Sequence, residues 1–175
     1  AAAGTPTTLL QIGAMDGVSA DPIHDVLIET DWPALLVEPV PEVFARLQEN
    51  YAGRVHIQLA NVAITGHSGE TMMHRICPQA LAEKKVPNWG HGASSLYRDR
   101  TALHWQEIAP HVTEISVPCL TLPGLLARYN IASLDVLQID AEGHDYAILR
   151  QLDFTRYRPA IINLEIVNLP EDEQE

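Results

Sequence analysis

The stretch that decides the fold is LDVLQIDAEGHDYAILRQL, residues 134–152. Its first part, residues 134–140, is a short apolar run of the kind that forms a buried β-strand. Its last part places Ile148, Leu149 and Leu152 on one side of a helix that begins near Asp145. A strand that leads directly into a helix is half of a βαβ unit.

The same alternation of strand and helix runs along most of the chain. Apolar runs predict strands at residues 8–13, 34–38, 55–60, 134–140 and 160–167. Further helices are predicted after Asp21-Pro22, from Pro41, and after a Thr121 N-cap. This pattern predicts an α/β fold with a mostly parallel sheet and helices on both faces. Such sheets bind ligands beyond the carboxyl ends of their strands, so functional residues are expected just after each strand.

The chain has 175 residues, the length of one ordinary domain. We assign residues 8–168 to that domain, preceded by a flexible N-terminus at 1–7 and followed by a solvated acidic tail at 169–175. Residues 78–110 mix Pro, Gly, His and Trp. We expect them to form an insertion over the end of the sheet, with one helix near 96–108. Strands are expected on either side of this insertion, near residues 70–76 and 113–118.

The composition excludes several classes of protein. The chain carries 23 acidic and 11 Lys or Arg residues, a net charge of -12, so its surface repels nucleic-acid backbones. No run of apolar residues is long enough to span a membrane, and no leader peptide is visible. Cys77 and Cys119 form no CxxC pair and are expected to be reduced thiols, which favours a cytoplasmic protein.

Polar residues follow each of the first three strands. Gly13–Gly17 (GAMDG) allows a tight turn and close approach of a ligand, but it lacks the third glycine of a dinucleotide-binding loop. An ordinary strand–helix turn explains it equally well. Glu38 lies 22 residues beyond Asp16, where an acid can bind ribose hydroxyls; a solvated strand-end carboxylate is the alternative. Asn61 suits an adenine edge, although an Asx turn is the simpler explanation.

The fourth strand ends at the densest group of ionisable residues, DAEGHD at 140–145. Crowded carboxylates beside an imidazole shift one another's pKa values, as an acid–base site requires. Helix capping explains Asp145 but not the whole group. Glu165 lies in an otherwise apolar run and must be paired or face a cleft. The spacing of zinc ligands, a serine nucleophile elbow and a P-loop are all absent from the sequence.

Five stretches together resemble the FkbM-type family of S-adenosylmethionine-dependent methyltransferases. In order they are QIGAMDG at 11–17, VEPVPEVFARLQEN at 37–50, LANVAITGHSGE at 59–70, the stretch at 134–152, and PAIINLEI at 159–166. The D-x-E-G-H-D piece is the most specific. The chain departs from the family at Gln138, where lysine is frequent, and at Pro123, where aspartate is common. The closing antiparallel hairpin of the fold is also not obvious.

The resemblance implies a class I, Rossmann-like methyltransferase fold with S-adenosylmethionine as cofactor. It also implies O-methylation of a hydroxyl on a sugar, polysaccharide or natural-product acceptor. By resemblance, Gly13, Ala14 and Gly17 frame the methionine part of the cofactor, Asp16 lies in the same loop, Glu38 holds the ribose, and Asn61 lies near the adenine. Asp140, Glu142, Gly143 and His144 line the cleft near the transferable methyl group, and a serine-containing loop is expected at 94–96.

The expected catalytic residues are His144, Asp140 and Glu142. His144 is a candidate general base, oriented by Glu142 or Asp140. Alternatively, the two carboxylates hold a divalent cation that acidifies the hydroxyl. We favour the metal-free version, because too few oxygen ligands are visible. Residues 78–110 are expected to select the acceptor; Trp89, His91 and Tyr97 either stack on a sugar ring or cover the core.

Two other classes stay open at this stage. A non-catalytic module that binds the cofactor on the same fold is favoured by the short C-terminus. A nicotinamide oxidoreductase is disfavoured by the missing third glycine. The sheet edge without its hairpin also offers a surface through which a second copy of the chain could complete the sheet.

Overall fold

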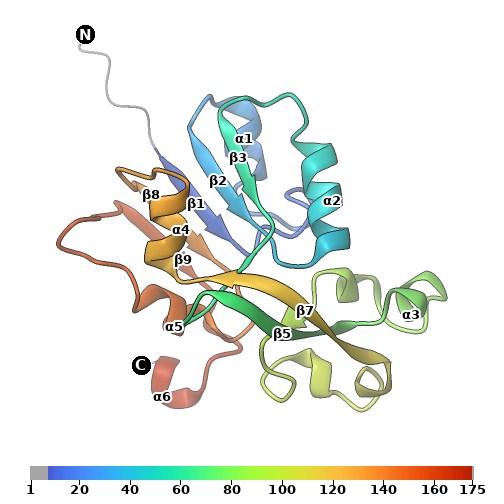
Figure 1. The fold of residues 1–175 in the computed structure, drawn as a ribbon. Helices are drawn as coiled ribbons and strands as arrows, with labels where there is room; N and C mark the ends of the chain where they lie inside the picture. The colour runs from blue at the N-terminus through green and yellow to red at the C-terminus, as the bar shows by residue number, and fades with distance from the viewer. Residues whose placement is uncertain (1–7, 175) are drawn as a thin grey trace, which may run out of the picture.

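The computed structural model describes residues 8–174, so the predicted flexible N-terminus at 1–7 lies outside the described residues. At its centre is a five-stranded sheet of order β3-β2-β1-β8-β9, in which every neighbouring pair is parallel (Figure 1). Its strands are β1 (Leu9–Ile12), β2 (Ala34–Val37), β3 (Ile57–Ala60), β8 (Val136–Ile139) and β9 (Ile161–Leu164). The predicted parallel α/β sheet is therefore confirmed, with each strand one to four residues shorter than the apolar run that predicted it.

Helices cover both faces of this sheet. Against one face, the buried side chains of α1 (His24–Glu29) and α2 (Pro41–Asn50) form a core with alternate residues of β1 and β2. Against the other face, α4 (Leu122–Arg128) and α5 (Asp145–Leu149) do the same. Thus Leu9 and Leu10 are both almost fully buried, but in different cores. This double burial explains why the strands are continuous apolar runs.

The helix starts predicted at Pro41, Thr121 and Asp145 are correct, and the start predicted at Asp21 is wrong. Pro41 opens α2, and the Thr121 hydroxyl accepts a hydrogen bond from the Gly124 N–H at the start of α4. Asp21, however, is not the N-cap of α1, which begins only at His24. The Asp21 carboxylate accepts hydrogen bonds from the Ile23 N–H and from the Gln11 side chain, and so closes a turn before the helix.

A second, four-stranded sheet of order β4-β7-β5-β6 lies beyond the carboxyl ends of the first (Figure 1). Its strands are β4 (Ala63–Ile64), β5 (Gly69–Ile76), β6 (Ser94–Ser95) and β7 (Val112–Leu120). β5 and β7 are antiparallel over their length, from the Gly69–Cys119 pair to the Ile76–Val112 pair. The long segment between them therefore leaves and returns at the same end of this ladder.

That segment, residues 77–111, includes β6, and its helices are all short: α3 (Pro78–Ala82) and the 3-10 turns η1 (Asn88–His91), η2 (Ala102–His104) and η3 (Ala109–His111). The helix predicted near 96–108 is wrong. Its two fully buried residues, Leu103 and Ile108, are five positions apart, which places them on different sides of an α-helix. A chain that turns between them can bury both.

The C-terminal residues are not simply a solvated tail. Glu171–Gln174 forms one helical turn, α6, and the Gln174 side-chain amide donates to the Leu169 carbonyl oxygen at 2.7 Å. Leu169 itself is buried. Of the acidic side chains of this turn, Glu171 and Asp172 are exposed and Glu173 is half-buried.

Strand β9 forms one edge of the parallel sheet, and within residues 8–174 it pairs only with β8. Its Ile161 and Ile162 side chains are 57% and 39% exposed. The hairpin that closes this fold elsewhere is thus not found among the described residues. Both cysteines are free, and no described helix is long and apolar enough to cross a membrane.

The first testable consequence concerns Gly13. Its φ angle is +82°, and a Cβ added there would lie 1.7 Å from the Asp140 carbonyl oxygen. Gly53 has almost the same φ, +83°, but nothing lies within 4 Å of its added Cβ. Gly53→Ala should therefore lower the free energy of unfolding by about 1 kcal/mol, the cost of the backbone conformation alone.

Gly13→Ala adds a clash with backbone that cannot move without separating β1 from β8. This variant should therefore lower the free energy of unfolding by more than about 3 kcal/mol. Urea unfolding of both variants measures the difference. Equal losses in the two variants would show that the contact with Asp140 relaxes freely.

Candidate functional site

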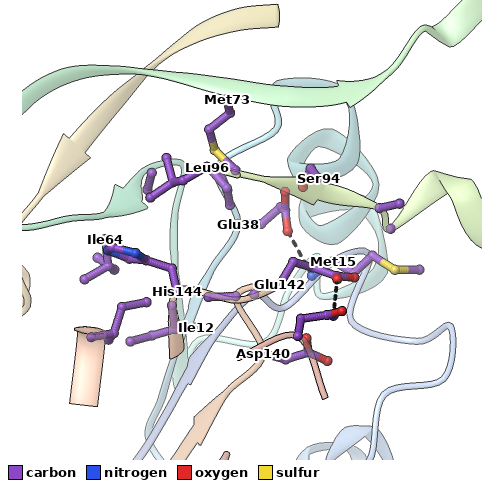
Figure 2. Close-up of a pocket in the computed structure, with 18 of the residues that line it drawn as sticks. Ile12, Met15, Glu38, Ile64, Met73, Ser94, Leu96, Asp140, Glu142 and His144 are labelled. Carbon is purple, nitrogen blue, oxygen red and sulfur yellow. Dashed lines mark hydrogen bonds between the residues drawn. The ribbon is translucent and has the colours of Figure 1, made fainter. Parts of the chain in front are cut away.

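A cavity of about 500 Å³ opens at the carboxyl ends of the parallel strands. Such a volume lies in the range of small-molecule sites. Figure 2 shows acidic side chains and His144 around it, with the apolar Ile12, Ile64, Met73 and Leu96 between them. Five of the expected site residues line the cavity: Gly13, Glu38, Asp140, Glu142 and His144. The other five, Ala14, Asp16, Gly17, Asn61 and Gly143, are not among its lining residues.

Glu38 is the acid that follows β2, and its side chain is almost completely buried. One carboxylate oxygen accepts a hydrogen bond from the Val40 N–H at 2.8 Å. The other accepts a hydrogen bond from the Met15 N–H at 3.1 Å (Figure 2). Burial raises the pKa of Glu38 to about 8, although both hydrogen bonds oppose the shift. Each oxygen keeps a second lone pair, so the group can still accept two hydroxyl donors.

The glycine loop after β1 is shaped by packing inside the protein. A Cβ on Gly17 would lie 2.3 Å from the Tyr51 ring, and the Tyr51 hydroxyl donates to the Gly17 carbonyl oxygen. Asp16 closes the turn by accepting hydrogen bonds from the Val18 and Ser19 N–H groups. Packing and turn formation therefore account for Gly17 and Asp16, and Gly13 and Met15 are the residues of this loop that line the cavity.

Asn61 acts on the backbone beside the cavity. Its side-chain N–H₂ donates to the carbonyl oxygens of Glu38 and Pro39, at 2.8 and 3.0 Å. The turn expected from sequence is thus replaced by a bridge between the ends of β2 and β3. Its neighbour Val62 lines the cavity instead.

Three carboxyl groups crowd the end of β8 and β9. Burial, and then the negative charge of Glu165, raises the pKa of Asp140 to about 7 and that of Glu142 to about 8. The pKa of Glu165 is raised mainly by burial, and the Asn168 side-chain amide donates to both Glu142 and Glu165. In residues 8–174, no three His, Cys, Asp or Glu side chains are grouped so that they could hold a metal ion.

Asp145 builds the loop that carries these groups. Its fully buried carboxylate accepts hydrogen bonds from the Ala141 and Gly143 N–H groups, at 2.9 and 3.1 Å. Glu142 and Gly143 both have positive φ angles, 51° and 94°. The loop is therefore held in a strained conformation by an acid at the start of α5. Asp145 is the first residue of α5 and not its N-cap, so the capping explanation is wrong: its carboxylate holds the preceding loop, and Asp140, Glu142 and His144 are left for the cavity.

His144 is oriented by a residue that sequence reasoning did not assign to it. Its Nδ1 lies 2.8 Å from the Tyr97 hydroxyl, whereas its Nε2 is buried and has no hydrogen-bond partner. The expected orientation by Glu142 or Asp140 is not observed. Burial, and then the nearby Arg100 charge, lowers the pKa of His144, which keeps the ring neutral at pH 7. Arg100 also stacks over the Tyr97 ring, 3.8 Å from its centre.

The serine-containing loop links the second sheet to this cavity. The Ser95 hydroxyl donates to the Glu142 carbonyl oxygen at 2.7 Å and accepts from the Tyr97 N–H at 3.0 Å. Ser94 and Leu96, on either side, line the cavity. Ser95 thus positions both Glu142 and Tyr97, and no local sequence signal indicates this role.

The raised pKa values predict how stability depends on pH. In the unfolded chain these carboxyl groups lose their protons near pH 4, but in the folded protein Asp140, Glu142 and Glu38 keep them until pH 7–8. Unfolding therefore releases protons, and the stability they contribute is full below pH 4 and is lost as pH rises to 8. Without ligand, the melting temperature should fall between pH 5 and 8.

The Glu142→Gln variant should show a smaller fall, because the amide does not titrate and its oxygen can still accept from Asn168. Asp153→Asn is a matched control at an exposed acid whose pKa is lowered by Thr155. Thermal unfolding followed by circular dichroism measures all three. A wild-type slope that Glu142→Gln leaves unchanged would contradict the assignment.

The comparisons with known proteins agree with this geometry. A family model described as the methyltransferase FkbM domain matches residues 11–175. No curated protein and no solved structure matches the chain. The matched range includes the last two residues of β1 and the whole of the other four strands of the parallel sheet. It also includes every residue named above that lines the cavity. The chain therefore belongs to the FkbM family of methyltransferases, which use S-adenosylmethionine.

Proposed function

We propose that this methyltransferase acts on a hydroxyl group of a sugar, polysaccharide or natural-product acceptor, and that His144 accepts the hydroxyl proton. The observation that carries the proposal is the pairing of His144 with Tyr97. It leaves Nε2 as the ring nitrogen with no partner, on a side chain that lines the cavity. The free thiols of Cys77 and Cys119 support a cytosolic location.

The protonation of His144 suits a general base. Its lowered pKa keeps the imidazole neutral at pH 7. When Nδ1–H donates to the Tyr97 oxygen, Nε2 holds the lone pair that can take a proton. Arg100 over the Tyr97 ring favours this arrangement, because a cation beside the pair disfavours a charged imidazolium before the reaction. Asp140 and Glu142 line the same cavity.

The residues present fit the cofactor. S-adenosylmethionine supplies an electrophilic methyl group on a positively charged sulfur, and its amino group adds a second positive charge. Burial, and then the charge of Glu165, raises the pKa of Asp140 and Glu142, so a cationic ligand would stabilise their charged forms. Glu38 has free lone pairs for the two ribose hydroxyls, and Gly13 lets the chain pass closely beside the ligand.

The cavity walls also serve the reaction. Apolar side chains from both sheets, among them Ile12, Ile64, Met73 and Leu96, line it between the polar groups (Figure 2). Walls of this kind exclude water and strengthen the interactions of the enclosed charges. Holding the reacting groups in line lowers the activation barrier further, by roughly 7–11 kcal/mol in well-oriented systems.

The role of Glu38 is tested by binding alone. Glu38→Gln should weaken S-adenosylhomocysteine binding about 2- to 10-fold, because an amide NH₂ replaces one of the two oxygens that can accept from the ribose hydroxyls, and a hydrogen bond contributes about 0.5–1.5 kcal/mol. Glu49→Gln, the same chemical change on the exposed end of α2, is the control and should leave affinity unchanged. Isothermal titration calorimetry measures both. Equal affinities of the two variants would remove Glu38 from the ribose site.

The role of His144 is tested by turnover on a panel of hydroxyl acceptors, with S-adenosylhomocysteine release as the signal. His144→Ala should lower kcat about 10²- to 10⁴-fold, the usual contribution of a general base, with cofactor affinity unchanged. Tyr97→Phe should lower kcat less, because Nε2 remains while its tautomer is no longer held.

His67→Ala, at an exposed turn, is the control for loss of a histidine. If His144→Ala retains the full kcat, another group takes the proton.

A further inference from the structure

A second cavity, of about 290 Å³, adjoins the first. Three basic side chains line it: Arg46 from α2, Arg75 from β5 and His91 from η1. The two cavities share Ala93 and Ser94 as lining residues, so they lie on either side of one short stretch of chain. A ligand that reaches over this stretch can occupy both.

The charged groups that line the second cavity are mainly basic, although the protein as a whole is acidic. The chain has only 11 Lys and Arg residues against 23 acids, yet two arginines and a histidine line a single cavity. One acid, Glu42, is also present, and it forms a salt bridge with Arg75. Glu42 neutralises Arg75, whereas Arg46 forms no salt bridge among the described residues and is left for a ligand.

Arg75 is not fully satisfied by the protein. Its Nη1 binds Glu42, but its Nε is buried and makes no hydrogen bond. A buried donor without a partner is destabilising, and a bound acceptor oxygen would relieve it. The pairing of β5 with β6 fixes the position of Arg75 opposite Ser94. The guanidinium is thus positioned beside the residues that the two cavities share.

The chemistry of these groups selects a ligand class. Guanidinium groups bind carboxylate and phosphate oxygens through paired N–H donors, and a histidine adds one more. The remaining walls are largely apolar, including Val43, Ile76 and Leu81, which suits the carbon frame of a ligand. Neutral hydroxyls would gain little from two arginines, whereas an anionic group would gain most.

We propose that the cavity of Arg46, Arg75 and His91 binds an anionic group, a carboxylate or a phosphate ester, carried by the methyl acceptor. The inference rests on the proposed function, because it names the class of acceptor that the main cavity methylates. The acceptor's hydroxyl then lies in the main cavity and its anionic group in the second.

The test is calorimetric titration of the full chain, saturated with S-adenosylhomocysteine, with glucuronate, glucose 6-phosphate and glucose. We expect at least one of the two anions to bind, glucose to bind at least about 10-fold more weakly, and the anion's affinity to fall as salt rises. The comparison of the two anions distinguishes a carboxylate from a phosphate. Binding of neither anion, or equal binding of glucose, would overturn the proposal.

Variants separate a binding role from a structural one. Arg75→Gln and Arg46→Gln should each weaken anion binding about 10-fold or more. Arg128→Gln, which removes the same charge from the exposed end of α4, should leave anion binding unchanged. Glu42→Gln should have the opposite effect and strengthen binding, because it removes the one acid in the cavity.

If the Arg75–Glu42 pair only supports the fold, Arg75→Gln and Glu42→Gln will change binding in the same direction, and that result would contradict the proposal. None of these readings depends on turnover. Failure of S-adenosylhomocysteine to bind, or loss of methylation with anion binding intact, would count against the proposed function and leave the second cavity as a binding site.

Discussion

The close approach of β1 and β8 is the constraint on which the site depends. The two strands pair in register up to Ile12 and Ile139, so Gly13 and Asp140 follow them side by side. The Gly13 backbone comes so near the Asp140 carbonyl that only a residue without Cβ fits. The Gly13 and Ala14 N–H groups both donate to the Val37 carbonyl, which ties the end of β2, and with it Glu38, to the same place.

This geometry gathers acids whose charges the protein itself does not compensate. Glu38, Asp140 and Glu142 all have pKa values raised mainly by burial, and no Lys or Arg among the described residues forms a salt bridge with them. The Asp145 carboxylate accepts two backbone N–H hydrogen bonds, which hold the loop in shape, while the neighbouring acids form no salt bridge in the described part of the chain. Such a site gives up some stability, and it gains most from a ligand that brings positive charge.

Local sequence pattern was sufficient for the parallel sheet and for the acids at its edge. The strands are short and buried on both faces, so their apolar runs are visible in the sequence, and parallel strands bring their carboxyl ends together. It was not sufficient for contacts between distant residues. Tyr97 lies 47 positions from His144, and Ser95 lies 47 from Glu142; neither pair belongs to one periodic element. The sequence pattern predicts a ligand-binding role for Gly17 and Asp16, but packing against Tyr51 accounts for Gly17 and turn formation accounts for Asp16. The error at residues 96–108 has the same origin, because buried residues in an irregular chain follow no period.

The ladder of β5 and β7 has a consequence for how such enzymes diversify. Residues 77–111 begin and end at the paired Ile76 and Val112, so both ends of this segment are held at one point of the second sheet. Replacing such a segment by a shorter or longer one changes the loop-closure entropy only slightly, and the strands that carry the acids are left as they are. The walls contributed by Trp89, Ser94 and Trp105 belong to this segment, whereas Glu38 and Asp140 do not. Exchange of this segment therefore leaves in place the strand ends that carry Glu38 and Asp140, where we propose that the methyl donor binds, provided that Ser95 and Tyr97, which contact Glu142 and His144, are kept.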